Sequence, residues 1–310
     1  MPRPERLATI ADKRKIVLVS GCSSGIGQAL AIEFASRNKE YHVFASARNL
    51  DSIRCLPSSI ERIQLDVTDE ESTKRCVESV IAQVGRIDVL VNNAGVNTGT
   101  GPSVEVELDR YRSTFEANFF GLIRLTQHVA PHMMDRRQGH IIQIGSTVGL
   151  VPLPYAASYA ASKAAVHSFS ETLAMELKGF NVDVTVVAPG AIKSSIGEKN
   201  VKHIKLPGDS RYKNVEDMVQ YRAIYSQVGR PAPSPTADFA REVVDRACPR
   251  QSSWSLVAWL WRTKPPAYVI AGSRSSLIKL LFYLPVWVRQ ALLGRAFQMG
   301  RVGKGKGKSA

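Results

Sequence analysis

Apolar residues in the first 190 positions gather in short runs that alternate with longer segments of mixed polarity. Six short runs are rich in Val, Ile and Leu and predict buried strands of a parallel sheet; they cover residues 15–20, 41–46, 62–67, 87–91, 140–145 and 183–188. Four longer segments predict helices; they cover residues 28–37, 70–84, 109–124 and 156–177. This alternation predicts right-handed crossovers and a doubly wound parallel sheet with helices on both faces.

The pattern changes after about residue 190, and no linker-like segment comes before that point. Residues 195–230 mix charged residues with Tyr and Leu and predict no strand. Residues 237–247 predict a further helix, and residues 265–272 predict a seventh strand. We therefore expect an α/β protein with one domain, residues 15–275, built on a sheet of about seven strands.

Both ends of the chain differ from this domain. Residues 1–14 are polar and charged and predict an N-terminal arm. Residues 276–310 predict an apolar, basic C-terminal extension that is helical, with Pro285 near the middle of its apolar part. Its last residues, 303–310 (GKGKGKSA), predict a disordered tail.

Length and composition are those of an intracellular globular protein. The 310 residues, 44% of them apolar, suffice for one large buried core. The cysteines have neither paired nor metal-ligand spacing, which predicts a reduced compartment and no metal site; they are Cys22, Cys55, Cys76 and Cys248. The N-terminus lacks a secretory signal, and no run approaches the ~18 apolar residues of a membrane-spanning helix.

The net charge of +14 belongs mainly to the two ends. The sequence after Arg250 has ten Lys and Arg residues and no Asp or Glu, and it holds all four tryptophans, Trp254, Trp259, Trp261 and Trp287. A basic segment mixed with Trp and Leu favours peripheral contact with anionic lipid, on a membrane or a lipid droplet. No nucleic-acid-binding motif accompanies this charge, so we expect no nucleic-acid partner.

The apolar residues of the extension have an equally strong alternative interpretation. Leu280, Leu281, Leu284 and Val288 fit packing on the body of the protein or on a second subunit, because a helical apolar stripe is more often core. Together these interpretations predict a location in the cytoplasm, or on the cytosolic face of the endoplasmic reticulum or of lipid droplets.

Residues 20–27 (SGCSSGIG) lie between the first predicted strand and the first predicted helix. Glycines in this context let the backbone turn sharply and approach a diphosphate, and the helix N-terminus favours its negative charge. The spacing is G-x-x-x-G-x-G rather than the commoner G-x-G-x-x-G. A simple strand-to-helix turn is the alternative.

The end of the second strand carries information about the cofactor. NAD-binding chains have an acidic residue there for the ribose hydroxyl, whereas this chain has Ser46, Ala47 and Arg48. The Arg48 guanidinium suits a 2′-phosphate, and Ser23 or Ser46 would add a hydroxyl. This favours NADP over NAD; the alternative is that Arg48 only opens the following loop.

Tyr159 and Lys163 stand four residues apart in the longest predicted helix, so they share a face. A neighbouring cation favours the ionised phenol, and we therefore expect Lys163 to lower the pKa of Tyr159. Such a tyrosine exchanges a proton with a carbonyl or alcohol oxygen. Ser146 follows the fifth strand, at the sheet edge where α/β proteins bind ligands. Chance spacing of Tyr and Lys is the alternative.

In this order the residues resemble the short-chain dehydrogenase/reductase family in its extended Rossmann form, over residues 15–194. The landmarks of the resemblance are Gly21, Gly25, Gly27, Asp66, Val67, Asn92 to Gly95, Asn118, Ser146, Tyr159, Lys163, Pro189 and Gly190. Ser20 and Ser194 stand where the family usually has Thr, and both keep the hydroxyl. The resemblance also implies that residues 195–230 form a substrate lid.

The resemblance implies a catalytic set of Asn118, Ser146, Tyr159 and Lys163. In it Tyr159 is the acid or base, Lys163 tunes it and holds the ribose, Ser146 bonds the substrate oxygen and Asn118 holds a relay water. The implied cofactor contacts are Ser20, Gly21, Ser23, Ser24, Gly25, Ile26, Gly27, Arg48, Asp66, Val67, Asn92, Ala94, Gly95, Asn118, Tyr159, Lys163, Pro189, Gly190, Ile192 and Ser194. For Asp66 the alternative is a turn cap, and for Asn118 a backbone contact within its helix.

The chain also resembles the branch of fungal NADPH-dependent 1-acyldihydroxyacetone-phosphate reductases. The features that carry this resemblance include residues 206–213 (LPGDSRYK), 264–267 (KPPA) and 284–288 (LPVWV), with Gly272. The resemblance implies an NADP(H) enzyme that reduces a ketone of a lipophilic substrate, or runs in reverse. The substrate is then either an acyldihydroxyacetone phosphate or a polyketide-like ketone of secondary metabolism. It also implies homo-oligomers formed through the helices of Asn118 and Tyr159.

Two other classes of function compete with the enzyme. A non-catalytic dinucleotide sensor or scaffold would have the same fold, but such proteins usually replace the tyrosine or the lysine, and both Tyr159 and Lys163 are present. A membrane structural protein would explain the C-terminal extension but not the residues of the predicted site.

Overall fold

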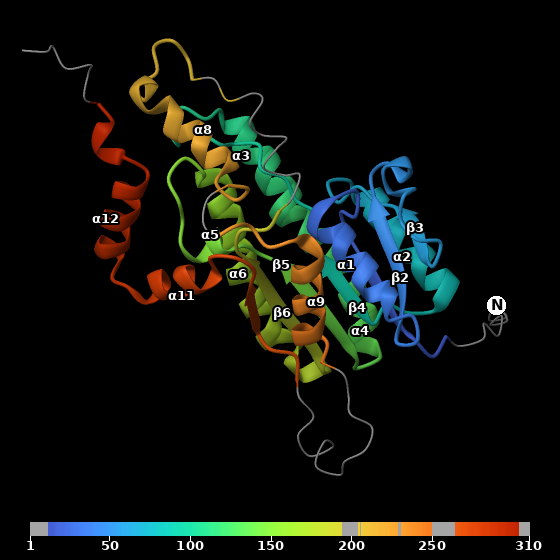
Figure 1. Ribbon diagram of the computed structural model, residues 1–310. Helices are drawn as coiled ribbons and strands as arrows, with labels where there is room; N and C mark the ends of the chain where they lie inside the picture. The colour runs from blue at the N-terminus through green and yellow to red at the C-terminus, as the bar shows by residue number, and fades with distance from the viewer. Residues whose placement is uncertain (1–11, 194–203, 205, 229–230, 250–263, 304–310) are drawn as a thin grey trace, which may run out of the picture.

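The computed structural model describes residues 12–193, 204, 206–228, 231–249 and 264–303. They form an α/β fold around one seven-stranded sheet in the order β3-β2-β1-β4-β5-β6-β7, with every neighbouring pair parallel. From β1 to β3 the strands are added toward one edge of the sheet, and from β4 to β7 they are added toward the other edge, as in a doubly wound fold. The predicted fold class, including the seventh strand, is confirmed (Figure 1).

The strands are short and most are buried. They are β1 (Lys15–Val19), β2 (Tyr41–Ala47), β3 (Ile60–Gln64), β4 (Val89–Asn92), β5 (Gly139–Ile144), β6 (Val182–Pro189) and β7 (Tyr268–Ala271). The inner strands form nearly unbroken apolar runs because helices cover both faces. β3 lies at the edge and buries only Ile60. The sequence predicted this strand at residues 62–67, whereas the observed strand begins at Ile60 and ends at Gln64.

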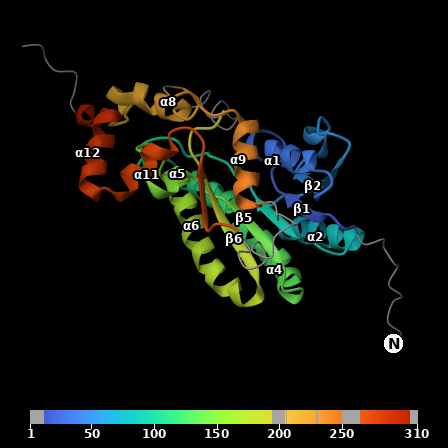
Figure 2. The ribbon, with the colours of Figure 1, turned by 60° about the horizontal axis from the view of Figure 1, so that its bottom comes forward.

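Helices cover both faces of the sheet (Figure 2). One face packs against α1 (Gly25–Ser36) and α9 (Thr236–Ala247). The other packs against α2 (Glu70–Val84), α4 (Gly121–Asp135) and α6 (Ala157–Leu177). Each face therefore has its own hydrophobic core.

Shorter helical segments complete the described chain. They are η1 (Leu50–Ile53), α3 (Leu108–Phe115), the π-helical turn η2 (Glu116–Phe120), α5 (Thr147–Leu150), η3 (Lys178–Phe180), η4 (Lys213–Val215), α8 (Glu216–Ile224), α11 (Ser275–Tyr283), α12 (Val286–Ala296) and η5 (Met299–Arg301). The helix predicted at residues 109–124 continues through η2 and α4 to Asp135. Leu125 and Val129 are buried against the sheet, and this packing outweighs the helix-breaking tendency of Pro131.

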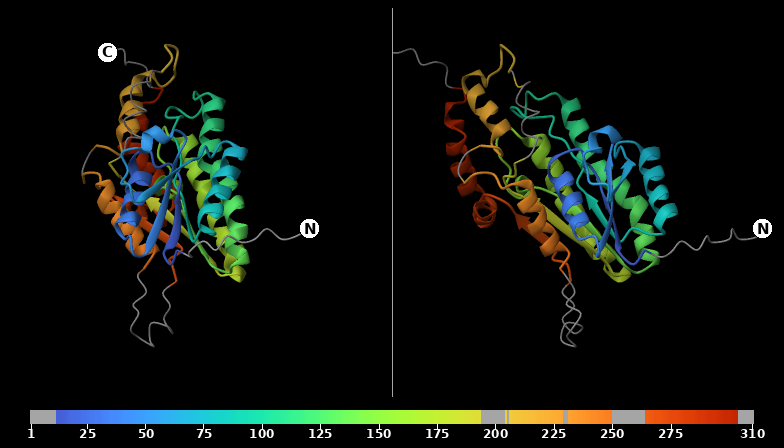
Figure 3. Two further views of the ribbon diagram at one scale, coloured as in Figure 1. Left: turned by 90° about the vertical axis from the view of Figure 1, so that its right-hand side faces the viewer. Right: turned by 45° about the vertical axis from the view of Figure 1, so that its right-hand side comes forward.

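The C-terminal extension packs on α8, which lies within the predicted lid. Phe297, just after α12, is buried, and its ring centre lies 6.4 Å from that of Tyr221 and 5.4 Å from that of Tyr225. An ion pair between Arg301 and Asp217 (3.0 Å) adds a polar contact. Figure 3 shows α8 and α12 side by side.

The outer surface of the extension remains apolar and exposed. α11 and α12 meet at Pro285, and only Leu281 of the two helices is buried. Leu280, Tyr283 and Trp287 are 62%, 84% and 72% exposed. Packing on the body therefore explains Leu281 but not these three side chains.

Some sequence-based predictions concern residues outside this description. They are the N-terminal arm up to residue 11, Ser194, Trp254, Trp259, Trp261 and the tail from residue 304. Within the part of the chain that the structure describes, each helix is too short or too polar to cross a bilayer.

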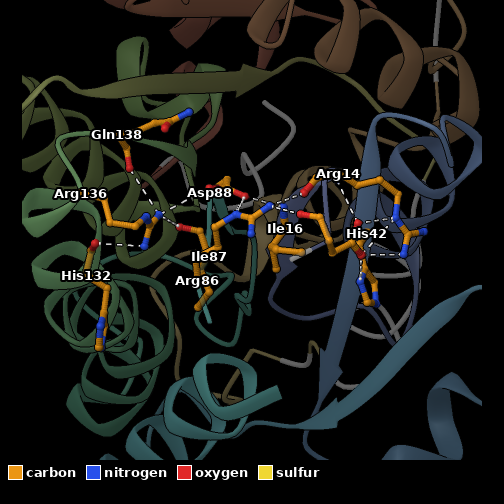
Figure 4. Close-up of polar contacts among 10 residues, drawn as sticks. Arg14, Ile16, His42, Arg86, Ile87, Asp88, His132, Arg136 and Gln138 are labelled. Atoms are coloured by element: carbon orange, nitrogen blue, oxygen red, sulfur yellow. Dashed lines mark hydrogen bonds and ion pairs between the residues drawn. The ribbon is translucent and has the colours of Figure 1, made fainter. Parts of the chain in front are cut away.

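A polar network fastens the amino-terminal ends of the central strands (Figure 4). The Asp88 carboxylate accepts hydrogen bonds from the Ile16 N–H (2.8 Å) and from Arg86 Nε (2.9 Å). Arg136, at the end of α4, donates to the Ile87 carbonyl (2.8 Å). The network links β1, β4 and α4 at the edge opposite the predicted site, so it supports the fold rather than the chemistry.

Candidate active site

A cavity of about 710 Å³ opens at the carboxyl ends of the strands, where α/β sheets bind ligands. It runs from the loop after β1 past α6 to α8. The predicted site residues that line it are Gly21, Ser23, Ser24, Gly25, Ile26, Arg48, Asp66, Val67, Ala94, Gly95, Ser146, Tyr159, Lys163, Pro189, Gly190 and Ile192. The structure therefore brings the cofactor and catalytic candidates together in one space.

Other predicted residues lie behind the cavity wall; they are Ser20, Gly27, Asn92 and Asn118, all buried. Ser20 shows what such a residue does. Its hydroxyl accepts hydrogen bonds from the backbone N–H groups of Asn93 (3.0 Å) and Ala94 (3.1 Å). It thereby holds the loop after β4 against the glycine loop.

The glycine loop allows a close approach that side chains would block. Gly21 has φ +72°, and a Cβ there would lie 2.8 Å from the Ala94 Cα. A Cβ on Gly27 would lie 2.4 Å from the Gly21 carbonyl oxygen. Helix α1 begins at Gly25, so its N-terminus forms part of the wall. Backbone N–H groups and the helix dipole at such a place favour an anion, and the diphosphate of a dinucleotide fits.

The far end of the cavity fits a 2′-phosphate. Arg48 is exposed there, directly after β2. Of the two serines considered from the sequence, Ser23 lines the cavity, whereas Ser46 is buried and its hydroxyl donates to a β1 carbonyl (3.1 Å). Asp66 Oδ1 accepts from the N–H (3.0 Å) and hydroxyl (2.8 Å) of Thr68, so it caps a turn while also lining the cavity.

Asn118 lies on the π-helical turn, and its side chain is bonded to other parts of the chain. Its Oδ1 accepts from the Val96 N–H (2.7 Å), and its Nδ2 donates to the Val96 carbonyl (2.9 Å) and to Ser162 Oγ (3.0 Å). It therefore does contact backbone, but across to the segment after β4 rather than within its own helix. The effect is to tie that segment to α6 beside the cavity.

Tyr159 and Lys163 share one face of α6, and the Lys163 Nζ lies 5.8 Å from the centre of the Tyr159 ring. Nζ donates to the Ile144 carbonyl at the end of β5 (2.7 Å). Burial lowers the pKa of the Lys163 ammonium to about 8. The Ser146 side chain, two residues after Ile144, acts to lower the pKa of the Tyr159 phenol. Three candidate catalytic side chains thus meet at the end of one strand.

The predicted effect of Lys163 on Tyr159 is wrong. Burial raises the pKa of the Tyr159 phenol, and it outweighs the hydrogen bond with Ser146 and the charge of Arg222, which act in the opposite direction. The Lys163 ammonium is bonded to the Ile144 carbonyl instead. The phenol is therefore protonated near neutral pH, which is the state that donates a proton to a carbonyl oxygen.

His167 is a positioning residue that the sequence analysis missed. Its Nε2 accepts a hydrogen bond from the Ser146 N–H (3.2 Å). Burial, together with the charge of Lys163, lowers the pKa of His167 to about 4, so the ring is neutral and its nitrogen accepts this bond. The available signal was its spacing, because His167 follows Lys163 by four residues on the same helix.

Toward α8 the cavity is lined by apolar side chains and a cation. Leu153, Leu277 and Ile278 line this end, and Arg222 lines it from α8. Arg222 is only 6% exposed. The sequence analysis missed it because residues 195–230 show no periodic pattern that would distinguish a buried arginine from a solvated one.

A glycine loop and a proton-donating tyrosine that share one cavity define a nicotinamide-dependent oxidoreductase. A family model described as short chain dehydrogenase matches residues 15–205, and the chain belongs to that family. The short-chain dehydrogenase virD of Hypocrea virens is 33% identical over 93% of this chain and 94% of its own length. The NADPH-dependent 1-acyldihydroxyacetone phosphate reductase of Schizosaccharomyces pombe is 31% identical over 89% of this chain and 92% of its own length.

Other relatives match less of the chain. Retinol dehydrogenase 8 of Bos taurus is 38% identical, and the match spans 63% of this chain and 64% of that protein. Among solved structures, a short-chain dehydrogenase from Streptomyces avermitilis has a TM-score of 0.69 and 26% identity, covering 93% of this chain and 98% of that one. Serine dehydrogenase complexed with NADP⁺ has a TM-score of 0.64 and 26% identity, covering 83% and 94%.

Proposed function

We propose that this protein is an NADP(H)-dependent oxidoreductase that reduces a ketone of a lipophilic substrate to a secondary alcohol, or catalyses the reverse reaction. The observation that carries the proposal is that Ser146, Tyr159 and Lys163 line the same cavity as the glycine loop and Arg48. The relatives that bind or use NADP support the choice of cofactor. The apolar end of the cavity supports a lipophilic substrate.

The cofactor supplies the hydride that reduces the carbonyl carbon. The protein orients the substrate and handles the proton. Tyr159, protonated near neutral pH, donates its phenol proton to the carbonyl oxygen as negative charge develops there. The Ser146 hydroxyl donates a hydrogen bond to the same oxygen. In the reverse direction the ionised Tyr159 accepts the proton of the alcohol.

The chain's own residues fit each part of NADP(H). The loop from Gly21 to Ile26 would hold the diphosphate, and Asp66 and Val67 would contact the adenine. Arg48 would pair with the 2′-phosphate. Lys163 would hold the hydroxyls of the nicotinamide ribose.

Two substrates fit this proposal. One is a 1-acyldihydroxyacetone phosphate, the substrate in the name of the Schizosaccharomyces pombe relative. The other is a polyketide-like ketone of secondary metabolism, as the resemblance to the same fungal branch implies.

The test is oxidation of NADPH by the purified protein, followed by loss of absorbance, with NADH run in parallel. The panel holds a 1-acyldihydroxyacetone phosphate, a 3-ketosteroid and several aromatic and aliphatic polyketide-like ketones. We expect turnover of at least one ketone, faster with NADPH than with NADH. NADPH binding without turnover of any ketone, and without oxidation of the matching alcohols by NADP⁺, would contradict catalysis and favour the sensor.

We further propose that the C-terminal extension contacts anionic lipid, on the endoplasmic reticulum or on lipid droplets. Leu280, Tyr283 and Trp287 give it an exposed apolar surface. Lys279 and Arg289 lie on the same two helices, and the sequence after Arg250 contains no acidic residue. Apolar side chains beside cations are the composition of interfacial helices.

Flotation with vesicles tests this contact. We expect the protein to float with vesicles rich in phosphatidylserine and not with phosphatidylcholine alone, because the cations need anionic headgroups. Trp287→Ser should reduce flotation several-fold, since it removes the largest exposed aromatic side chain of the described residues. Met175→Ser is the matched control, because Met175 is 71% exposed on α6. Equal flotation of the two variants would argue against the contact.

A further inference from the structure

Arg222 occupies a place where a charge normally has a partner. It belongs to α8, lines the cavity that also holds Tyr159, and is only 6% exposed. Burial lowers the pKa of its guanidinium to about 10, so the group still carries its charge at neutral pH. Its Nε is buried without a hydrogen-bond partner.

The nearby acidic residues are engaged elsewhere. Glu216 and Asp217, in the first turn of α8, form ion pairs with Lys213 (2.8 Å) and Arg301 (3.0 Å). Across the residues that the structure describes, no carboxylate forms an ion pair with Arg222. Among the described residues, the phenols of Tyr159 and Tyr225 favour its charge. A buried cation with no anion beside it is costly, so a ligand that supplies the counter-charge would be stabilised here.

Arg274, a second arginine that lines the same cavity, differs from Arg222 in its hydrogen bonds. Arg274 donates to the carbonyl oxygens of Tyr225 (2.8 Å), Pro231 (3.3 Å) and Val228, and its guanidinium lies 4.8 Å from the Tyr225 ring centre. These bonds fasten the end of the lid, so Arg274 is structural. Arg222 makes no such bonds to the residues that the structure describes, and it lines the cavity near Tyr159.

We propose that Arg222 is an anion subsite, so the substrate carries a carboxylate or phosphate group beside the ketone that is reduced. The inference rests on the proposed function, because it takes the cavity beyond Tyr159 to be the place of the substrate. The apolar part of the substrate then lies along Leu153, Leu277 and Ile278. An arginine fork recognises the two oxygens of such a group together, which also fixes the orientation of the ketone toward Tyr159.

The test measures binding rather than turnover, so it stands apart from the test of the proposed function. The ligands are decanoate, decyl phosphate and decanol, titrated by calorimetry into protein saturated with NADP⁺. We expect the wild type to bind at least one of the two anions about ten-fold or more tightly than decanol. The relative affinities for decanoate and decyl phosphate then indicate whether the substrate is a keto acid or a keto phosphate.

Variants test whether Arg222 is the residue that gives the preference for the anion. Arg222→Met keeps the length of the apolar stem, and we expect it to lose the preference for the anion while binding decanol and NADPH as the wild type does. Arg222→Lys, which keeps a charge, should retain part of the preference. Arg211→Met is the matched control, since it removes an exposed cation of the lid that does not line the cavity; it should change nothing.

Three outcomes of the binding experiments would overturn the proposal. The first is that wild-type protein binds decanol as tightly as both anions. The second is that the folded Arg222→Met protein keeps the preference for the anion. The third is that this variant loses affinity for NADPH itself, which would make Arg222 a cofactor contact. Reduction of neutral ketones alone by the wild type would support the proposed function and still contradict the subsite.

Discussion

Tyr159→Phe is expected to reduce kcat by about 10²–10⁴-fold, the range typical of a positioned general acid. The phenol is the group that donates the proton, and the phenyl ring of Phe keeps the half-buried ring in the cavity wall. We expect the affinity for NADPH to change by less than about three-fold, because this substitution leaves the loop and Arg48 in place. Steady-state rates and NADPH fluorescence titrations measure the two quantities.

Tyr155→Phe is the matched control for that experiment. Tyr155 is buried, and among the described residues its hydroxyl has no hydrogen-bond partner. The control protein should therefore have nearly wild-type activity. If Tyr159→Phe retained substantial activity, the assignment of Tyr159 as the general acid would fail.

Arg48→Ala is expected to weaken NADPH binding by about 10–100-fold and NADH binding by less than about three-fold. A charge-assisted hydrogen bond is worth roughly 1.5–3 kcal/mol, and only NADPH has the 2′-phosphate that accepts it. Arg48 is exposed at the end of β2, so its removal should not disturb the core. The measurement is the dissociation constant of each cofactor.

Arg54→Ala provides the comparison for Arg48. Arg54 is an exposed arginine that pairs with Asp51 (2.8 Å) and does not line the cavity. The Arg54→Ala substitution should leave the dissociation constants of NADPH and NADH unchanged. Equal loss of NADPH and NADH binding in Arg48→Ala would exclude the role in 2′-phosphate recognition.

Most of the fold could be predicted because its elements carry strong local patterns. The inner strands are covered on both faces, so they appear as apolar runs, and α2 has Asp69 before it and Gly85 after it, two residues that commonly bound helices. The errors arose where tertiary packing decides. β3 is an edge strand that buries only Ile60, so apolar residues do not mark its bounds, and α4 continues past Pro131 because its buried face packs against the sheet.

The candidate site could be predicted only in part, for a physical reason. Gly21 and the pair of Tyr159 and Lys163 depend on local geometry, which spacing along the chain reports. The pKa of Tyr159 depends on burial, and the roles of His167 and Arg222 depend on neighbours distant in sequence. Arg222 in particular is one of several basic residues in an irregular segment, and only the fold shows that it is buried.

The contact of Phe297 with Tyr221 and Tyr225 has a consequence for protein engineering. The contact joins α8, in the predicted lid, to the C-terminal extension, although many residues separate them in sequence, so we expect the two segments to be exchangeable only together. A chimera that takes only the lid of a relative would leave Phe297 against foreign side chains, whereas a chimera that takes both segments keeps the contact. Transfer of both segments should therefore use three crossover points: one on each side of the predicted lid, and one after β7, before the extension.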